Sequence, residues 1–439
     1  MLSFLRLPWP ADQCRLPEPV NRRMNRLMSD PTREAAFDLL TAVLERRRPL
    51  EEALTALPPI PARDRAAAHR LAAAVLRRIG TLDAIVEPYL RKEPPAPVRI
   101  VLRIGAAGLV LLGTPSHAAV ATAVALARGR GLTPFAGLIN AVLRKVATNG
   151  AAALADLDSP RLDTPTWLWS SWGEHARSIA IAHQTEAPLD LTLRPGTPIP
   201  ADAESLPTGS VRYPAGTSVS DIPGFAEGAL WVQDAAAALP AALLAPRAGE
   251  RIADLCAAPG GKTGQLAGAG ATVFAVERDK SRIPRLIENL KRWGLTAEVV
   301  HADATTWTPP QRFDAVLLDA PCSATGTIRR HPDVSRLKRQ TDLKMLTESQ
   351  DRLLDAAIRM LRPGGRLVYS VCSLQPEEGA PRVQAAIARG GVRLEPFTRD
   401  ELPGLPEAIG ADGFARTHPA MWPERGGLDG FFIGRLIKL

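Results

Sequence analysis

Two cysteines stand where apolar, strand-like runs end, and they are the residues best suited to covalent chemistry. Cys322 comes three residues after Asp319, which ends the run Phe313–Asp319, and Cys372 follows the run Arg366–Val371. Because the carboxyl ends of parallel strands meet at one edge of a sheet, we expect both thiols at the same edge. A lone buried Cys usually acts as a small hydrophobic side chain. Two thiols, with an acid close to one of them, indicate nucleophilic chemistry instead.

The reaction that uses such a set is methylation of a pyrimidine ring carbon. Carbon 5 of cytosine is too weak a nucleophile to attack a sulfonium methyl group until a thiolate has added at carbon 6. A carboxylic acid at ring nitrogen 3 stabilises that adduct, and afterwards the carbon 5 proton must leave and the thiol must be expelled. A free Cys is only a few per cent thiolate at neutral pH, so the site has to lower the pKa of the attacking thiol. Position at a strand end does not decide which of the two cysteines attacks.

A glycine-rich turn follows a third strand-like run, Arg251–Cys256. The chain reads DLCAAPGGKT over 254–263, and the missing Cβ of glycine lets a ligand approach the backbone closely. A phosphate-binding Walker A loop would need a Gly five residues before Gly261, where this chain has Cys256. The G-x-G-x-x-G pattern of a dinucleotide fold does not occur there either. The turn therefore predicts a nucleoside site.

Acidic residues end the neighbouring runs. Glu277 comes 23 residues after Asp254, where a carboxylate can accept both ribose hydroxyls. Asp303 follows the next run and can accept from an adenine amine. One acid at a strand end is often a solvated turn residue, but three around one glycine turn favour a cofactor site.

The elements that must position these residues form an α/β domain over 246–439. Helical stretches at Lys280–Trp293 and Thr347–Leu361 separate the strand-like runs, which predicts a doubly wound parallel sheet. Phe431–Leu439 is expected to be its last strand. The runs that we expect to be the other strands are Arg251–Cys256, Thr272–Glu277, Ala297–His301, Phe313–Asp319 and Arg366–Val371.

Residues 29–147 predict an all-α domain. Ser29 and Asp30 resemble a helix cap, and Pro-rich breaks divide a long helical pattern. Residues 31–150 carry 17 Lys and Arg against 9 Asp and Glu, which accounts for the whole net charge of +8 and suggests a polyanionic partner. The alternative interpretation of this basic excess is a set of solvated arginines on helix faces that bind no partner. We expect a linker over 148–164 and a small α+β RNA-binding subdomain over 165–245, in which Trp167, Trp169 and Trp172 pack into a core.

The motifs DLCAAPGGKT, LLDAPCSATG, VYSVCS and DGFFIGRL resemble those of the RsmB/NOP family of RNA cytosine-5 methyltransferases, from about residue 228 to 439. The segment with HAAVATAVALAR and LINAVLRK resembles a NusB-like RNA-binding domain. Together they imply a Rossmann-like class I methyltransferase domain after an all-α NusB-like domain, as in the bacterial branch that modifies 16S rRNA. Val371 and Glu277 depart from the Thr and Asp that the family usually has.

The resemblance also assigns roles. It implies that Cys372 attacks, that Cys322 aids product release, and that Asp319 faces the base. S-adenosyl-L-methionine is the implied cofactor, and the residues implied to line its site are Asp319, Glu277, Asp303, Cys256, Ala257, Ala258, Pro259, Gly260, Gly261 and Lys262. Basic residues after the Cys322 loop are expected to grip phosphates next to a flipped-out base; they are Arg329, Arg330, His331, Arg336, Lys338 and Arg339.

Two other functions remain open at this point. A tRNA cytosine-5 methyltransferase would share every catalytic residue. An inactive RNA-binding assembly factor would require a lost nucleophile, and Cys372 is present. The four cysteines form no C-x-x-C pair, so we expect no metal site and reduced thiols in the cytoplasm. We further expect no membrane span, a monomer, a disordered extension over 1–28, and a true start at Met1, Met24 or Met28.

Overall fold

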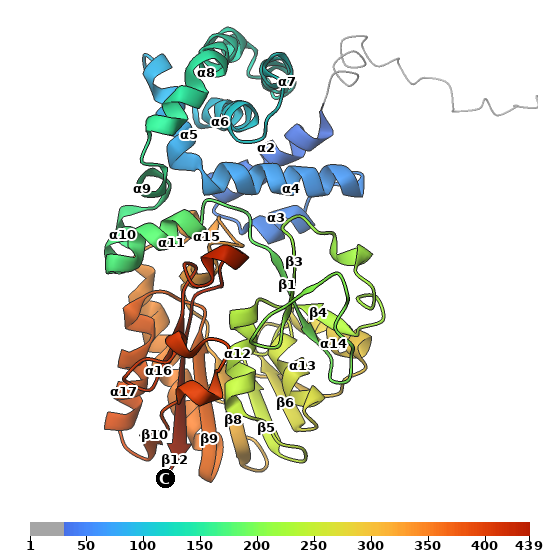
Figure 1. Cartoon of the computed structure of the whole chain (residues 1–439), viewed down its shortest axis with the longest axis vertical. Helices are drawn as coiled ribbons and strands as arrows, with labels where there is room; N and C mark the ends of the chain where they lie inside the picture. Colours follow the sequence, from blue (N-terminus) through green and yellow to red (C-terminus); the bar gives the residue numbers. More distant parts are fainter. Residues whose placement is uncertain (1–29) are drawn as a thin grey trace, which may run out of the picture.

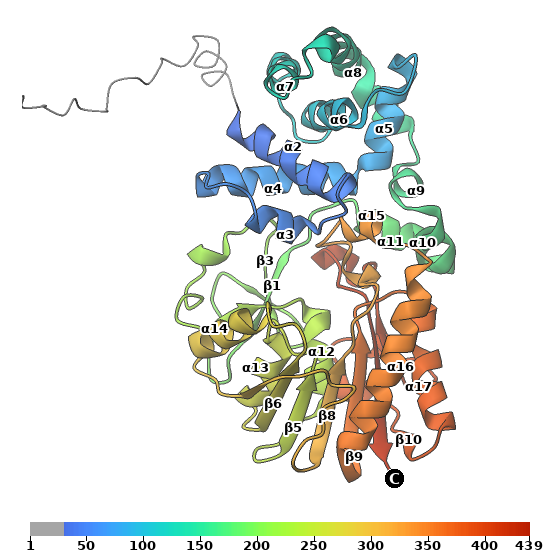
Figure 2. The same ribbon diagram turned by 180° about the vertical axis from the view of Figure 1, so that it is seen from behind.

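The computed structural model describes residues 30–439 (Figure 1). The extension expected over 1–28, with its three candidate start residues, lies outside the described part. A helical domain stands above an α/β domain, and the carboxyl ends of the parallel strands point toward the helices (Figures 1 and 2). That edge, where sequence motifs place the chemistry, therefore faces the rest of the chain.

The N-terminal domain is all helical, as predicted. Asp30 caps its first helix by accepting from the backbone N–H of Arg33 at 3.1 Å. Pro residues occupy the positions just before or at the start of several later helices, where a missing N–H does no harm. The helices are α2 (Pro31–Leu44), α3 (Leu50–Thr55), α4 (Ala62–Arg77), α5 (Ile79–Val86), α6 (Ala96–Val110), α7 (Ser116–Gly129) and α8 (Ala136–Asp156).

The segment 148–164, which we expected to be a linker, is largely helical. Helix α8 continues to Asp156, and α9 (Ser159–Asp163) follows. Gly150 is buried against α6, and Leu154 and Leu157 pack on the helical core. The small residues here are largely alanines, which have the highest helix propensity.

Residues 165–234 mix helices with a small antiparallel sheet. Helices α10 (Thr166–Ser171) and α11 (Ala176–Ala182) carry the tryptophan cluster, in which Trp172 is buried and the other two are partly buried around Leu168. The prediction that these rings pack into a core is confirmed. The sheet has the order β2-β3-β1-β4, with strands β1 (Leu189–Leu193), β2 (Glu204–Ser205), β3 (Val211–Tyr213) and β4 (Leu230–Val232).

The large sheet has the Rossmann-like arrangement. Its order is β10-β12-β9-β8-β5-β6-β7, with β5 to β9 parallel, β12 antiparallel beside β9, and β11 paired to β12. Five predicted parallel strands and the final strand are confirmed; β10 and β11 were not predicted. The strands are β5 (Arg251–Leu255), β6 (Thr272–Glu277), β7 (Glu298–His301), β8 (Phe313–Asp319), β9 (Leu361–Val371), β10 (Val392–Leu394), β11 (Ala415–Thr417) and β12 (Phe431–Lys438).

Helices cover both faces of this sheet, as its continuous apolar strands require. One face packs against α12 (Ala235–Leu244) and α13 (Gly261–Gly268), with α14 (Ile283–Trp293) beside them. The other packs against α16 (Asp342–Met360) and α17 (Ala380–Ala388). Both helical stretches expected between strands, 280–293 and 347–361, are present as α14 and α16.

Candidate active site

The glycine-rich turn leaves β5 at its carboxyl end and leads into α13. Cys256 and Gly260 both have positive φ, 64° and 107°, so the chain reverses tightly there. A Cβ on Gly260 would lie 2.6 Å from Leu286, which explains why only glycine fits. Thr263 donates to the buried carboxylate of Asp254 at 2.5 Å and ties the start of α13 to the end of β5. The backbone of the turn is thereby fixed before any ligand binds.

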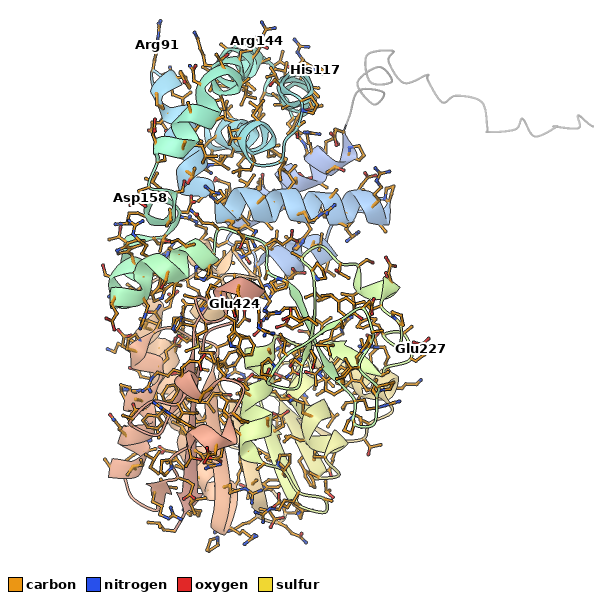
Figure 3. All side chains as sticks on the ribbon, viewed as in Figure 1. Arg91, His117, Arg144, Asp158, Glu227 and Glu424 are labelled. Atoms are coloured by element: carbon orange, nitrogen blue, oxygen red, sulfur yellow. The ribbon has the colours of Figure 1, made fainter. Side chains whose placement is uncertain are left out.

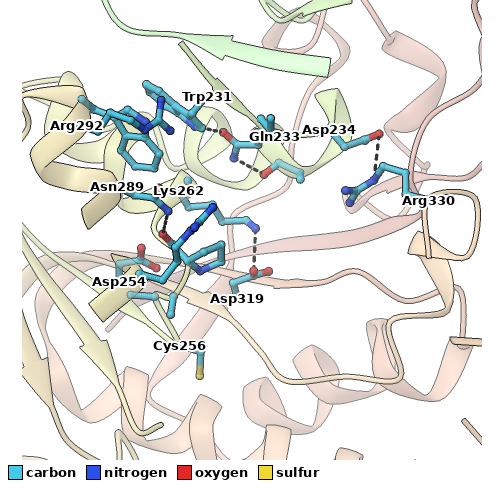
Figure 4. Close-up of a pocket in the computed structure, with 18 of the residues that line it drawn as sticks. Trp231, Gln233, Asp234, Asp254, Cys256, Lys262, Asn289, Arg292, Asp319 and Arg330 are labelled. Atoms are coloured by element: carbon cyan, nitrogen blue, oxygen red, sulfur yellow. Dashed lines mark hydrogen bonds and ion pairs between the residues drawn. The ribbon is translucent and has the colours of Figure 1, made fainter. Parts of the chain in front are cut away.

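A cavity of about 380 Å³ opens on this turn (Figure 4). Its far wall is the segment from β4 to α12 together with α14, which sequence reasoning did not connect with the site. Trp231 and Gln233 lie there, and the indole N–H of Trp231 donates to Gln233 at 2.8 Å. The residues that line the cavity are Phe225, Trp231, Val232, Gln233, Asp234, Ala237, Asp254, Cys256, Ala257, Ala258, Pro259, Gly261, Lys262, Arg285, Asn289, Arg292, Trp293, Asp319 and Arg330.

Asp319 and Lys262 meet on the floor of the cavity. The Lys262 ammonium donates to Asp319 at 2.7 Å, and the Ser370 hydroxyl donates to the other oxygen of the same carboxylate at 2.9 Å. Burial disfavours the charged form of Lys262, but the charge of Asp319 and its hydrogen bond, together with further negative groups nearby, raise the pKa of Lys262. These two bonds fix the orientation of the Asp319 carboxylate, which the sequence assigned to both cofactor and base.

Glu277 and Asp303 lie at the ends of β6 and β7, as predicted, but neither lines the cavity. The Glu277 carboxylate is 4% exposed and accepts from the backbone N–H of Ala258 at 3.2 Å, so it sits beside the turn. Asp303 is more exposed and accepts from Thr305, which lowers the pKa of the Asp303 carboxyl. The acids and the turn thus follow one another along the sheet edge from β8 to β7.

These residues fit S-adenosylmethionine. The cofactor is a sulfonium nucleoside, so it needs a close backbone approach, a carboxylate for the ribose hydroxyls and an acceptor for the adenine amine. Gly261 lines the cavity and can offer the first, and each Glu277 carboxylate oxygen retains a second lone pair for a hydroxyl. The Asp303 side chain is 38% exposed at the next strand end and can accept from the amine.

The two predicted active-site thiols lie together. The sulfur atoms of Cys322 and Cys372 are 3.4 Å apart, and either thiol can donate to the other. Cys322 is buried, and Cys372 is half-buried. The hydrogen bond that the Cys322 S–H donates to Cys372 and the burial of the side chain raise the pKa of Cys322 well above its usual value. Cys322 therefore carries a proton at neutral pH.

Cys256 stands apart from this pair. Burial, with the negative charges of Glu277 and Asp319, raises the pKa of its thiol to about 12. It therefore stays protonated and serves the turn through its backbone, not through thiolate chemistry.

An unpredicted carboxylate lies beneath the two thiols. Glu378 is fully buried in the short helix η6 (Pro376–Glu378), and it accepts hydrogen bonds from Ser323, Ser373 and Gln350. Each serine directly follows one of the cysteines. The only sequence signal was an acid six residues after Cys372, on a segment that no motif had singled out.

The basic segment after the Cys322 loop lies largely between the two domains. Arg329 is 1% exposed and pairs with the buried carboxylates of Asp234 and Asp429. Its backbone carbonyl accepts from Arg77 of α4 at 2.9 Å. Arg330 bonds Asp429 and also reaches the cavity. The Arg329 guanidinium therefore holds the fold together and is not presented to a phosphate.

The rest of the segment continues this junction through α15 (Val334–Leu337). Asp333 accepts from the backbone N–H of Leu50 at 2.9 Å, and Arg336 donates to the carbonyl of Asp163 at 2.7 Å. Burial lowers the pKa of His331 to about 4, so the ring is neutral at pH 7. Of the six basic residues predicted to contact RNA, Arg339 is exposed, and phosphate contact stays a prediction for it and for the partly exposed residues Arg330, His331, Arg336 and Lys338.

Within residues 30–439, no group of three or more His, Cys, Asp or Glu side chains could hold a metal ion. In the same range no helix combines the length and the apolar character that crossing a membrane requires.

Family models match both parts of the chain. The model described as 16S rRNA methyltransferase RsmB/F matches residues 241–437, and that of the NusB family matches residues 30–148. The chain is 35% identical to ribosomal RNA small subunit methyltransferase B of Vibrio cholerae, over 92% of this chain and 97% of that protein. It is also 35% identical to the protein of the same name from Xanthomonas campestris, over 93% and 97%.

Solved structures agree in fold. The crystal structure of PH0851 gives a TM-score of 0.71 at 22% identity and covers 92% of this chain and 99% of that one. A methyltransferase homolog protein from Pyrococcus horikoshii gives 0.52 at 27% identity, covering 65% of this chain and 96% of its own.

Fold and site define a Rossmann-like methyltransferase that uses S-adenosylmethionine and carries a NusB-like helical domain. Within that class, the chain belongs to the RsmB/F family of 16S rRNA methyltransferases.

Proposed function

We propose that this protein methylates carbon 5 of a cytosine in 16S rRNA through a covalent bond between Cys372 and the RNA. The observation that carries the proposal is the pair of thiols 3.4 Å apart at the sheet edge that also holds Asp319 and the cofactor turn. A methyltransferase that acts on a nitrogen or a hydroxyl needs neither thiol. The choice of 16S rRNA rests on the relatives, whose names state small subunit ribosomal RNA.

Cys372 is the proposed nucleophile because it is the more accessible of the two thiols. Its thiolate would attack carbon 6, while Asp319 passes a proton to ring nitrogen 3 and takes the developing charge off the base. The Lys262 ammonium donates to Asp319 and would supply this proton. Ser370 holds the carboxylate in place through its second oxygen.

Bound S-adenosylmethionine supplies the methyl group that carbon 5 receives. The turn from Cys256 to Lys262 would hold it, with Glu277 on the ribose and Asp303 on the adenine.

Cys322 completes the reaction. Before attack its S–H can donate to the Cys372 sulfur, which is the arrangement that keeps the proton on Cys322. Once Cys372 has become a neutral thioether, that negative neighbour is gone, and Cys322 can give its proton to a water molecule and then act as a base. It then removes the carbon 5 proton, and the electrons that return to the ring expel Cys372 as a thiolate.

The RNA is proposed to approach along the helical domain and the mouth of the cavity. Arg91 and Arg144 project from the outer end of the helical domain, away from the junction (Figure 3). Arg330 lines the cavity, and we propose that Arg330, Lys338 and Arg339 contact phosphates beside the flipped-out cytosine. Such a substrate would place the protein in the cytoplasm.

The test is to incubate the purified protein with unmodified 16S rRNA, in free and subunit-bound forms, and methyl-labelled cofactor. Digestion to nucleosides should give label in 5-methylcytidine, and bisulfite sequencing should show a protected cytosine. Label in another nucleoside, or transfer to tRNA alone, would contradict the proposal.

A further inference from the structure

Glu378 receives four donors and is completely shielded from solvent. One carboxylate oxygen accepts from the backbone N–H of Ser323 and from the Gln350 amide, each at 2.9 Å. The other accepts from the hydroxyls of Ser323 and Ser373, each at 2.5 Å. No Lys or Arg among the described residues forms an ion pair with it, so these hydrogen bonds alone offset the burial of the group.

The four bonds join the two loops that carry the thiols. Ser323 follows Cys322 at the end of β8, and Ser373 follows Cys372 at the end of β9. The two hydroxyls also lie 2.9 Å from each other. Since each serine is one residue from a thiol, the carboxylate is bonded directly beside both sulfur-bearing residues.

The position of Glu378 is itself fixed. Its backbone carbonyl accepts from the buried Tyr369 hydroxyl at 2.7 Å, and Gln350 of α16 also donates to the carbonyl of Pro321 at 3.0 Å. The carboxylate therefore stands on a rigid base that reaches from β9 to α16. An apolar side chain of similar size would fill the same space but could not accept from the two hydroxyls and the two N–H groups.

We infer that Glu378 is a positioning residue, which clamps both thiol loops so that Cys372 and Cys322 act on one base. The inference rests on the proposed function for its catalytic consequence, but the clamp itself can be measured without turnover. It predicts that the spacing of the thiols, and not the binding of either substrate, depends on this carboxylate.

The experiment compares Glu378→Ala and Glu378→Gln with the unchanged protein, and uses Glu377→Ala as a matched control, because Glu377 is the exposed neighbour. Glu378→Ala should lower kcat about 10- to 100-fold, since a misplacement of about 1 Å can cost that much. KM for RNA and the affinity for S-adenosylmethionine should stay within about twofold, as a group that touches neither substrate requires. Glu378→Gln keeps an acceptor for the N–H and should recover most of the rate.

The spacing itself is read from disulfide formation. Diamide removes one hydrogen from each of two thiols and joins their sulfurs, so its rate with this pair reports how closely they are held. Mass spectrometry of the peptide that links Cys322 to Cys372 should show slower formation in Glu378→Ala and an unchanged rate in Glu377→Ala.

If Glu378→Ala does not fold, as judged by cofactor binding and circular dichroism, Ser373→Ala and Ser323→Ala replace it, since each removes one bond to the clamp. Unchanged kcat and unchanged disulfide rates in the folded variants would overturn the inference. The inference would also be overturned if a folded variant showed a raised KM for RNA or weaker binding of S-adenosylmethionine while its kcat stayed unchanged. If the unchanged protein makes no 5-methylcytidine, the proposed function fails, while the disulfide rates still decide whether Glu378 sets the thiol spacing.

Discussion

Replacing Arg329 by Ala should destabilise the protein and leave the electrostatic part of RNA binding intact. The Arg329 guanidinium is 1% exposed and lies 2.5 Å from Asp234 and 3.5 Å from Asp429, which are equally buried. Asp234 caps α12, and Asp429 precedes β12, so one arginine joins the β8 loop to both. Burial already raises the pKa of Asp429 to about 6, although Arg330 and Arg329 oppose this.

The expected loss of folding stability in Arg329→Ala arises because two buried carboxylates lose one of their neighbouring cations. Breaking a buried pair by removing one partner typically costs about 3–5 kcal/mol. Arg330 remains beside Asp429 and compensates in part, so we expect a loss near the lower end of that range. Chemical denaturation followed by tryptophan fluorescence measures it.

The matched control is Arg339→Ala, at an exposed position of the same segment. It should leave stability unchanged and flatten the dependence of log K for RNA on log salt by about 0.7 if it removes one phosphate contact to single-stranded RNA. At temperatures where the Arg329→Ala protein is folded, its slope of log K for RNA against log salt should equal that of the unchanged protein. A stable Arg329→Ala protein with a flatter slope would refute the structural role and return Arg329 to the RNA interface.

Two further predictions concern the cofactor edge. Glu277→Ala should weaken S-adenosylmethionine binding, because two ribose hydroxyls lose a charged acceptor worth roughly 1.5–3 kcal/mol per bond; an unchanged Kd by calorimetry would remove Glu277 from the site. Burial raises the pKa of Asp254 from 3.8 to about 7, so the folded protein holds this proton where the unfolded chain has lost it. The contribution of Asp254 to stability is thus complete below pH 4 and is lost as pH rises toward 7. The stability of Asp254→Asn relative to the unchanged protein should rise over that window by up to about 4 kcal/mol, and a flat difference would show that Asp254 titrates normally.

The sheet and the turn were predictable because their signals are local. Five- to seven-residue apolar runs that end in acids, glycines or cysteines mark parallel strands and their carboxyl edge, and β5, β6 and β8 lie within a residue of the predicted bounds. Strands β10 and β11 were missed because three residues at a sheet edge carry no readable period. The alanines after residue 150 are compatible with either a linker or a helix. The segment is helical because the neighbouring leucines pack on the core of the helical domain.

The polar clusters could not be predicted, since their partners are far apart in sequence. Glu378 meets Ser323 from 55 residues away, and Arg329 meets Asp234 from 95. A run of basic residues looks the same whether it faces RNA or buried acids, and only the tertiary arrangement distinguishes Arg329 from Arg339. The thiol pair was foreseen because both cysteines end neighbouring strands, β8 and β9.

The most direct test of the proposed chemistry is a denaturing gel of the two cysteine variants with labelled 16S rRNA and S-adenosylmethionine. Cys322→Ala keeps the attacking thiol, so it should transfer the methyl group and then stall, giving a protein band shifted by bound RNA. Cys372→Ala lacks the nucleophile and should give neither the shifted band nor methyl transfer, and the double variant should also give no band. A shifted band with Cys372→Ala instead would exchange the two roles. Full activity in both single variants would contradict covalent catalysis by either thiol.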